Sequence, residues 1–334
     1  MEQRSLGRTG PLTAPLGLGC MGMSGVYGPA DRQESIATIH AALDAGITLI
    51  DTGDFYGMGH NEMLIAEALK GQPRDSYLLS VKFGAQRDPA GGWLGFDGRP
   101  AAVKTALAYS LQRLGVDHVD IYRPARLDPA VPIEETIGAI ADMVKAGYVR
   151  HIGLSEVGAE TIRRAAAIHP ICDLQIEYSL LSRGPEEAIL PVTRELGIAI
   201  TAYGVLSRGL ISSHFAPEQT AAPSDFRSHS PRFQAGNVEA NLALVGRLRA
   251  IAEAKGATLA QIAIAWAAAQ GGDIIPLLGT KRRDRLAEAL GALDISLDAA
   301  DLAAIEQAVP RDAAAGDRYP AAQMAMLDSE ARRS

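Results

Sequence analysis

The chain has 334 residues, of which 47% are hydrophobic and 21% are charged, as in an ordinary globular protein with a large core. The formal net charge of −7 argues against nucleic acid and against an anionic membrane as partners. With two cysteines there is no disulfide framework, and no stretch reaches the roughly 18 uninterrupted apolar residues of a membrane-spanning helix. We therefore expect a cytoplasmic protein with one large domain or two ordinary ones.

The predicted elements alternate regularly along the chain. Residues 3–16 are expected to form a short hairpin that turns at residues 8–10. Apolar runs predict strands at residues 16–19, 47–51, 78–82, 118–122, 149–154, 173–177, 198–202 and 274–278. Amphipathic periodicity predicts helices at residues 31–45, 60–70, 100–114, 132–146, 159–168, 186–196, 238–270 (in two pieces, split at Gly256) and 282–292. Glycines suited to left-handed helix ends follow several of them, at Gly46, Gly115, Gly147, Gly197 and Gly256.

Eight strands that alternate with eight helices favour parallel strands joined by crossovers. Eight such units close into a (β/α)8 TIM barrel, with an open doubly wound sheet as the alternative. Two segments exceed the repeat, namely the long loop at residues 209–237 after strand 7 and a C-terminal extension from Ser296. Because no low-complexity linker divides the chain, residues 1–334 are expected to form a single domain.

One glycine motif points to a different fold. Gly17-x-Gly19-x-x-Gly22 matches the dinucleotide-binding fingerprint, and Asp51 ends the next strand where a ribose-binding acid could lie. In a dinucleotide fold, however, the helix begins within the glycine run. Here residues 23–30 intervene and carry further glycines and a proline. The glycines therefore favour a barrel strand that a neighbour or a ligand approaches closely.

Charged and polar residues collect at the predicted C-terminal ends of the strands, where TIM-barrel enzymes keep their catalytic groups. They are Asp51, Tyr56, Lys82, Ser155, Gln175 and Tyr203. A buried lysine is costly unless it is paired, and Asp51 is the available partner of Lys82. We expect Lys82 to lower the pKa of Tyr56, which would let the phenol exchange a proton with a carbonyl oxygen near neutral pH. The alternative is a purely structural Asp–Lys pair.

The spacing of Asp51, Tyr56 and Lys82 resembles that of the aldo-keto reductase superfamily, and the resemblance covers almost the whole chain. Further motifs agree with it in order: the N-terminal hairpin, Gly153-Leu-Ser-Glu156, Gln175-x-Glu-Tyr-Ser179, Ala202-Tyr-Gly-Val-Leu-Ser-Arg-Gly209 and Gly279-Thr-Lys-Arg-x-x-Arg285-x-x-Glu288. The resemblance implies reversible, NADPH-dependent reduction of an aldehyde or ketone, with Tyr56 as general acid and base assisted by Lys82 and Asp51.

The resemblance also implies a cofactor site without a dinucleotide fold. Ser155 and Gln175 would bind the nicotinamide carboxamide, and Tyr203 would stack on its ring. Residues 206–210, with Leu206, Arg208 and Leu210, would follow the pyrophosphate. Gly279, Lys281, Arg282, Arg285 and Glu288 would surround the adenosine end, with the cations at the 2′-phosphate. Physical chemistry agrees, because cations that open a helix favour a bound anion, although a solvated basic turn is the alternative reading.

Two positions depart from the family pattern. Ala125 stands where a catalytic histidine is usual, so Tyr56 is expected to be the sole acid, with Arg123, Arg126 or water positioning the carbonyl oxygen. Ala289 stands where an asparagine often contacts adenine.

The substrate pocket is expected to come from loops over the rim. Its candidates are Met23, Tyr27, Phe55, Met58, Trp93 with residues 94–96, Arg123, Ala125, Arg126 and the tail at residues 310–334. The carbonyl substrate, the direction of reaction and the oligomeric state stay open.

Two other classes of function remain as rivals. A metal-dependent barrel enzyme lacks support because no His-x-His or His-Glu-x-x-His spacing occurs. A nucleotide-binding, redox-sensing regulatory subunit with weak turnover is the other rival, and Ala125 is its main support.

Overall fold

The computed structural model describes residues 1–216 and 225–330, and eight of the described strands close into one barrel. Around the ring they are β10 (Ile171–Glu177), β11 (Ala199–Tyr203), β12 (Ile274–Gly279), β3 (Gly17–Gly19), β4 (Leu49–Gly53), β5 (Leu78–Phe83), β8 (Val119–Pro124) and β9 (Val149–Ser155). Every neighbouring pair in the ring is parallel. The predicted TIM barrel is confirmed, and the open sheet is wrong.

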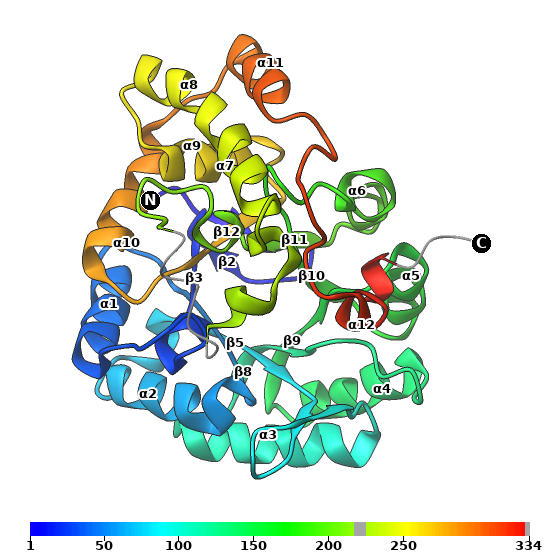
Figure 1. The fold of residues 1–334 in the computed structure, drawn as a ribbon. Helices are drawn as coiled ribbons and strands as arrows, with labels where there is room; N and C mark the ends of the chain where they lie inside the picture. The colour runs from blue at the N-terminus through cyan, green and yellow to red at the C-terminus, as the bar shows by residue number, and fades with distance from the viewer. Residues whose placement is uncertain (217–224, 331–334) are drawn as a thin grey trace.

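The helices form an outer ring around these strands (Figure 1). Those that follow a barrel strand are α1 (Arg32–Asp44), α2 (His60–Ala68), α3 (Pro100–Leu114), α4 (Ile133–Lys145), α5 (Ala159–Ile168), α6 (Pro185–Leu196), α7 (Asn237–Arg247), α8 (Arg249–Ala254), α9 (Leu259–Ala269) and α10 (Arg283–Leu290). The C-terminal extension adds α11 (Ala299–Ala308) and α12 (Ala321–Met324). Short 3₁₀ turns lie at Met21–Ser24, Tyr56–Gly59, Arg74–Ser76, Ser207–Gly209, Phe226–His229, Pro231–Phe233, Gly291–Asp294 and Asp328–Glu330.

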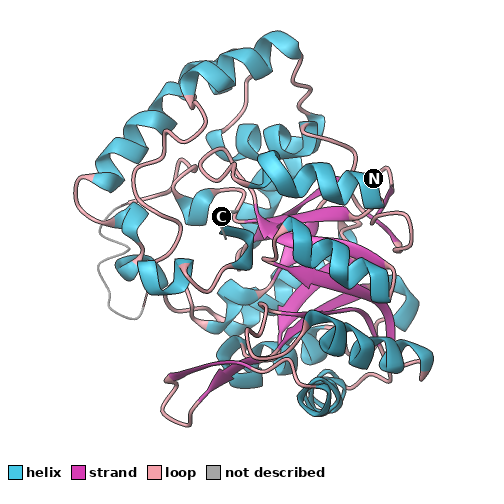
Figure 2. Ribbon diagram, turned by 90° about the vertical axis from the view of Figure 1, so that its right-hand side faces the viewer, coloured by secondary structure: helices cyan, strands magenta, loops and turns pink. Residues whose placement is uncertain are grey.

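Two local features differ from the sequence-based expectation. The helix expected at residues 238–270 is three helices, because the backbone also tightens at Leu248, whose N–H bonds to the carbonyl of Val245. An extra hairpin, β6 (Ala85–Arg87) with β7 (Trp93–Phe96), stands between β5 and α3 and projects from the barrel (Figure 2). Its short, exposed strands carry too little apolar periodicity to be recognised from the sequence. Of the long loop expected at residues 209–237, residues 217–224 lie outside the described part.

The N-terminal hairpin, β1 (Arg4–Ser5) with β2 (Leu12–Thr13), covers the N-terminal ends of the strands. The backbone N–H of Arg8 bonds to the carbonyl of Gly197, just before β11. At Gly7, where φ is +74°, a Cβ would lie 2.2 Å from the carbonyl oxygen of Cys172, so only glycine fits. With this end of the barrel closed, the opposite end, called the mouth below, is the open one.

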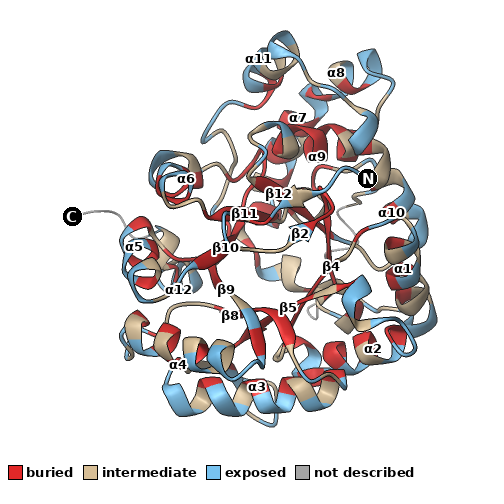
Figure 3. Ribbon diagram, turned by 180° about the vertical axis from the view of Figure 1, so that it is seen from behind, coloured by how far each residue is buried: buried red, intermediate tan, exposed pale blue. Residues whose placement is uncertain are grey.

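Strands of the barrel are buried on both faces, as Figure 3 shows by their red colour. Every residue of β4, β8 and β10 is buried. A Cβ on Gly17 would lie 2.9 Å from a methyl carbon of Leu277 on the neighbouring strand, so the glycines of β3 allow close packing across the interior. Because α1 begins only at Arg32, these glycines do not open a helix as a dinucleotide fingerprint requires.

Both cysteines, Cys20 and Cys172, are buried free thiols. None of the described helices has the length and apolar composition needed to cross a membrane. Within residues 1–216 and 225–330, no group of three or more metal-binding side chains comes together.

Candidate active site

A sharp turn after β4 carries Tyr56 into the barrel mouth. Gly57 and Met58 both adopt positive φ (56° and 53°), which folds the chain back before α2 begins at His60. The phenol side chain packs edge-on against Phe55, with ring centroids 4.7 Å apart. Tyr56 is only 8% exposed, so most of its side chain is shielded from solvent.

Beneath this phenol lies the buried ion pair of Asp51 and Lys82. The pairing register of β4 and β5 sets Asp51 beside Ser80, and Lys82 is two residues further along the same strand face. The Lys82 ammonium donates to one carboxylate oxygen of Asp51. Ser80 Oγ and the Gln175 amide nitrogen each donate to the other oxygen at 2.8 Å. The carboxylate is thus fully hydrogen-bonded, as a buried charge must be.

Lys82 also faces Tyr56, with its Nζ 5.2 Å from the centre of the phenol ring. The structure therefore brings together the three residues that the sequence singled out as catalytic. A cation at this distance attracts the ring face and would stabilise negative charge on the phenol oxygen.

A second polar group lies at the ends of β8, β9 and β11. Arg126 Nη1 donates to the carbonyl of Ala125 at 2.6 Å and to Ser155 Oγ at 3.4 Å. Tyr203 Oη donates to Glu156 at 2.7 Å and lies 3.0 Å from the hydroxyl of Tyr319. Tyr319 belongs to the C-terminal tail, so this tail supplies a residue to the mouth.

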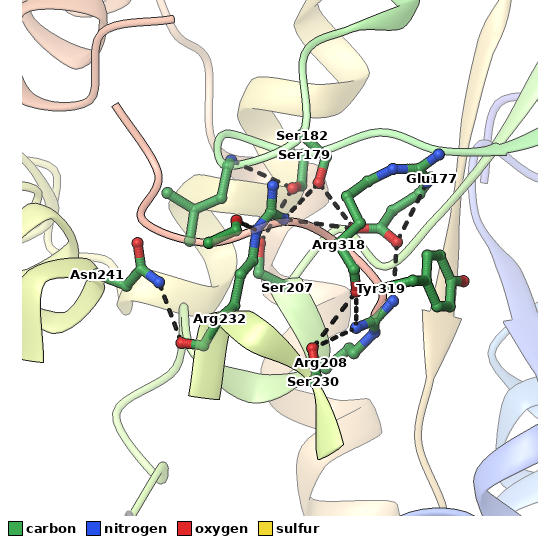
Figure 4. Close-up of polar contacts among 12 residues, drawn as sticks. Glu177, Ser179, Ser182, Ser207, Arg208, Ser230, Arg232, Asn241, Arg318 and Tyr319 are labelled. Carbon is green, nitrogen blue, oxygen red and sulfur yellow. Dashed lines mark hydrogen bonds and ion pairs between the residues drawn. The ribbon is translucent and has the colours of Figure 1, made fainter. Parts of the chain in front are cut away.

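The tail is held there by a buried charge network (Figure 4). Arg318 contacts both oxygens of Glu156, at 3.1 and 2.9 Å, and one oxygen of Glu177 at 3.4 Å. Arg208 bonds to Glu177 at 3.2 Å and to the carbonyl of Arg318 at 2.6 Å, and its guanidinium lies 4.5 Å from the Tyr319 ring centre. The arginines lower the pKa values of both glutamates against the opposing effect of burial.

The basic turn before α10 borders a surface cavity of about 740 Å³. The cavity is lined by Pro29, Asp31, Glu34, Lys281, Arg282, Arg283 and Asp284. Arg282 pairs with Asp284 and Arg283 pairs with Glu34, while Lys281 donates to the backbone carbonyls of residues 27–29. An open cavity flanked by cations at a helix N-terminus suits an anionic group of a bound ligand.

Other residues expected at the cofactor lie at the end of β12, on α10 and around the turn that carries Arg208. Gly279 is exposed at the end of β12, and Arg285 and Glu288 form an ion pair at 3.6 Å on α10. Leu206 is partly buried and Leu210 is fully buried, on either side of the turn that carries Arg208.

A model of the family described as "Aldo/keto reductase family" matches residues 15–310. The chain belongs to this family. It is 42% identical over 316 residues to the probable aldo-keto reductase 1 of Glycine max, covering 94% of this chain and 90% of that protein. Among solved structures, the glycerol dehydrogenase AKR11B4 from Gluconobacter oxydans has a TM-score of 0.82 at 28% identity, covering 90% of this chain and 93% of the other. The holo form of aldo-keto reductase AKR11C1 from Bacillus halodurans has a TM-score of 0.75 at 26% identity, covering 92% and 96%.

As an aldo-keto reductase, the protein is an oxidoreductase of carbonyl chemistry. The environment of Tyr56 nevertheless corrects one expectation. Burial, followed by the Asp51 carboxylate, raises the pKa of Tyr56 well above its usual range, and Arg126 is the cation that opposes this shift. Lys82 was expected to lower this pKa. Its effect is outweighed, because burial removes the phenolate from water and the Asp51 carboxylate opposes the ammonium charge.

Arg123 does not lie at the mouth, contrary to the expectation that it lines the substrate pocket. Its side chain is 0% exposed inside the barrel, where it pairs with Asp173 at 2.8 Å and donates to Ser80 Oγ at 2.9 Å. Arg123 lies within β8 and its side chain turns into the barrel interior, whereas Arg126 follows the end of the strand.

The other residues predicted to line the substrate pocket range from fully buried to exposed. Met23 is almost fully buried in the core, and Ala125 is buried with its N–H bonded to the carbonyl of Phe83. Tyr27 lies under the guanidinium of Arg227, 5.7 Å from its ring centre. Trp93 is 43% exposed on the projecting β6–β7 hairpin.

Sequence reasoning missed a carboxylate next to the catalytic turn. Asp54 lies between β4 and Tyr56, and one of its oxygens is buried without a hydrogen bond, as is one oxygen of Glu62. Arg113 pairs with the other Glu62 oxygen. Burial, and then the charge of Glu62, raises the pKa of Asp54 to about 7. The motif contained both acids, but only the fold shows that Glu62 pairs with Arg113 while Asp54 is left without a cation partner among the described residues.

Replacing Asp54 by asparagine is expected to stabilise the reductase more at pH 8 than at pH 4.5. In the folded state the carboxyl group of Asp54 stays protonated up to about pH 7. In the unfolded chain it loses its proton near the reference pKa of about 3.9. The unfolded state therefore binds fewer protons between these two values, so wild-type stability falls as the pH rises across this window. The Asp54→Asn substitution removes that loss, an effect on the order of 2 to 4 kcal/mol at pH 8.

Denaturant unfolding at the two pH values measures this difference. The matched control is Asp44→Asn, which removes an exposed carboxylate at the end of α1 and should give the same small effect at both pH values. A stability difference for Asp54→Asn that does not change with pH would contradict the assignment.

Proposed function

We propose that this reductase reduces an aldehyde or ketone to the alcohol with NADPH as hydride donor, and that Tyr56 is the general acid. The observation that carries the proposal is the phenol of Tyr56 above the buried Asp51–Lys82 pair at the barrel mouth. An acid must hold its proton until the carbonyl oxygen becomes negative. The raised pKa of Tyr56 keeps the phenol protonated throughout the neutral range.

Once the proton has left, the phenolate needs nearby positive charge. Lys82 lies 5.2 Å from the ring centre, and Arg126 acts on the same phenol. Both cations favour the charged product of proton transfer. In the reverse direction the phenolate is the base, so alcohol oxidation should become faster as the pH rises.

A reduced nicotinamide supplies the hydride when it is bound. We assign Ser155 and Gln175 to its carboxamide and Tyr203 to its ring face, by the family resemblance. Among the described residues, Ser155 Oγ accepts only its long bond from Arg126 and the Gln175 oxygen accepts no bond, since Gln175 uses its nitrogen on Asp51. We assign residues 206–210 to the pyrophosphate and the cavity at Lys281 to the adenosine phosphate.

A preference for NADPH over NADH should depend on Arg282. Its side chain is more than half exposed, and within the described part of the chain it pairs only with the exposed Asp284, so it can turn toward a 2′-phosphate. We expect Arg282→Gln to raise the KM for NADPH about 5-fold while leaving the KM for NADH unchanged, as for the loss of one exposed charge contact. Steady-state kinetics with both cofactors measures this. Arg163→Gln, which breaks an equally exposed pair with Glu195 between α5 and α6, is the matched control.

Ala125 favours one rival proposal, a redox-sensing subunit that binds the nucleotide but turns over slowly. A methyl group cannot donate a hydrogen bond to the carbonyl oxygen, as the usual histidine would. In the enzyme, Arg126 or water takes that part, since Arg123 is engaged inside the barrel.

The deciding experiment is NADPH oxidation across a panel of aldehydes and ketones at several pH values, repeated with NADH. Steady turnover with at least one carbonyl compound supports the enzyme. Tight NADPH binding without turnover of any member supports the regulatory subunit. Absence of NADPH binding would contradict both.

A further inference from the structure

Arg126, which is partly buried, differs from Arg318 and Arg208 at the mouth because it has no carboxylate partner among the described residues. Arg318 pairs with Glu156, and Arg208 pairs with Glu177. No carboxylate of the described residues comes within ion-pair distance of Arg126. Its hydrogen bonds go to the carbonyl of Ala125, Ser155 Oγ and the hydroxyl of Tyr319, all of them neutral.

The nearest carboxylates have no capacity left for this guanidinium. Glu156 accepts hydrogen bonds from Arg318, Tyr203 Oη, Ser329 Oγ and the backbone N–H of Glu177. Five contacts to two oxygens exceed the four lone pairs of a carboxylate. Its charge therefore reaches Arg126 only from a distance.

Hydrogen-bond directions explain how Arg126 is held. Tyr203 has one proton and gives it to Glu156, so Tyr319 must be the donor in its 3.0 Å bond to Tyr203. Tyr319 must in turn accept from Arg126 Nη2, at 3.5 Å. The two phenols thus form a neutral bridge from the cation to Glu156 and fix the guanidinium without neutralising it.

This arrangement leaves two N–H groups of Arg126 available, one on Nε and one on Nη2. A guanidinium has five N–H groups, and the three hydrogen bonds within the described part of the chain use two on Nη1 and one on Nη2. Two neighbouring N–H groups on one cation match the two oxygens of a carboxylate. The small side chain of Ala125 adds no bulk next to them.

We propose that Arg126 binds a carboxylate of the substrate, so that the preferred substrates are oxo acids, carbonyl compounds that also carry a carboxylate. The inference rests on the proposed function, since it places the anion beside the phenol that protonates the carbonyl oxygen. Arg126 Nη1 bonds to Ser155 Oγ, and Ser155 pairs in register with Gln175. The Gln175 amide bonds to the Asp51 carboxylate beneath Tyr56, so these contacts place Arg126 and the phenol at the same mouth. A partly buried cation whose partner arrives with the substrate gains more from that partner than a fully solvated one does.

Matched pairs of substrates test the proposal. The probes are 4-oxobutanoate and its methyl ester, and pyruvate and its methyl ester, with NADPH held at saturation. In each pair the ester keeps the carbonyl group and loses the charge. We expect the wild-type kcat/KM for the better acid to exceed that of its ester about 10- to 100-fold, as for one charge-assisted hydrogen-bonded contact.

In Arg126→Gln this acid-to-ester ratio should fall to about one, and Arg126→Lys should restore part of it because a point charge returns without the paired N–H groups. Arg163→Gln should leave the ratio unchanged. An equal fall for acid and ester would overturn the proposal and assign Arg126 to the carbonyl oxygen. A higher KM for NADPH with an unchanged ratio would overturn it in favour of the nicotinamide carboxamide.

The proposal can also fail separately from the proposed function. If the wild type had equal kcat/KM values for the acids and their esters, the carboxylate site would be rejected while the reductase activity would stand. If no carbonyl compound is reduced, calorimetric binding of 4-oxobutanoate to the NADPH complex decides. Binding to the wild type but not to Arg126→Gln upholds the anion site, and equal or absent binding rejects it.

Discussion

Replacing Tyr56 by phenylalanine is expected to lower kcat/KM for carbonyl reduction by about 10²- to 10⁴-fold, the usual contribution of a positioned general acid. The variant keeps the ring that packs against Phe55 and faces Lys82, so the turn and the ion pair should survive. Only the proton donor is lost. NADPH oxidation with the best substrate of the carbonyl panel measures the effect, and the KM for NADPH should stay within about 2-fold.

The pH dependence of the two reaction directions tests the role of Tyr56 independently. Because burial raises the pKa of Tyr56, reduction by the wild type should not decline through the neutral range, while alcohol oxidation should increase with pH. Tyr109→Phe, on the exposed side of α3, is the matched control and should change neither activity nor profile. A Tyr56→Phe enzyme with full reductase activity would remove the basis of the proposed mechanism.

Replacing Arg318 by methionine should be the most destabilising single change in the tail, with a loss of about 3 to 5 kcal/mol at pH 7. Methionine fills most of the space but leaves Glu156 buried without its main cation, and Glu177 loses one of its arginines. The same change releases Tyr319 from the mouth, so activity should fall as well. Denaturant unfolding and steady-state kinetics measure the two effects.

The stability loss should shrink in acid. Arg318 helps hold the pKa of Glu156 well below its usual range, while the unfolded chain takes up this proton near the reference value of about 4.3. A carboxyl group with a lowered pKa stabilises the folded state above that reference value, and the contribution is lost as the pH falls below it. The difference between wild type and variant should therefore be largest at pH 7 and smaller at pH 3.5.

Two further variants test whether the loss of stability comes from the charge network around Arg318. Arg311→Met removes a more exposed arginine of the same tail, paired at 3.6 Å with Glu186 and Glu187, and should cost no more than about 1 kcal/mol. Glu156→Gln combined with Arg318→Met should recover part of the loss, because the unpaired buried charge is gone. If the Arg311 and Arg318 variants were equally stable, the tail would not be held by the network.

The barrel could be predicted from the sequence because the patterns that mark its strands and helices are local. Apolar runs of four to six residues marked the strands, 3.6-residue periodicity marked the helices, and glycines marked the helix ends. Gly46, Gly115, Gly147, Gly197 and Gly256 all adopt positive φ in the structure. Thr258 caps α9 through a capping box with Gln261, which is also a local interaction.

The sequence also determined which side chains meet beneath Tyr56. Successive parallel strands of a barrel present their C-terminal ends at one mouth, so Asp51 and Lys82 had to be neighbours once the strands were assigned. What it could not give was the direction of the pKa shift at Tyr56. That direction depends on how much water the surrounding loops exclude, which is a property of the packed chain.

Only the tertiary structure decided the parts that join distant segments. Arg123 turned inward to Asp173 while Arg126 stayed at the mouth, and Arg318 reached Glu156 across 162 residues of sequence. Such pairings depend on side-chain directions and on loops that carry no periodic signal. The sequence alone thus determines the repeating backbone through local propensity, while long-range burial and charge pairing settle the chemistry of the mouth.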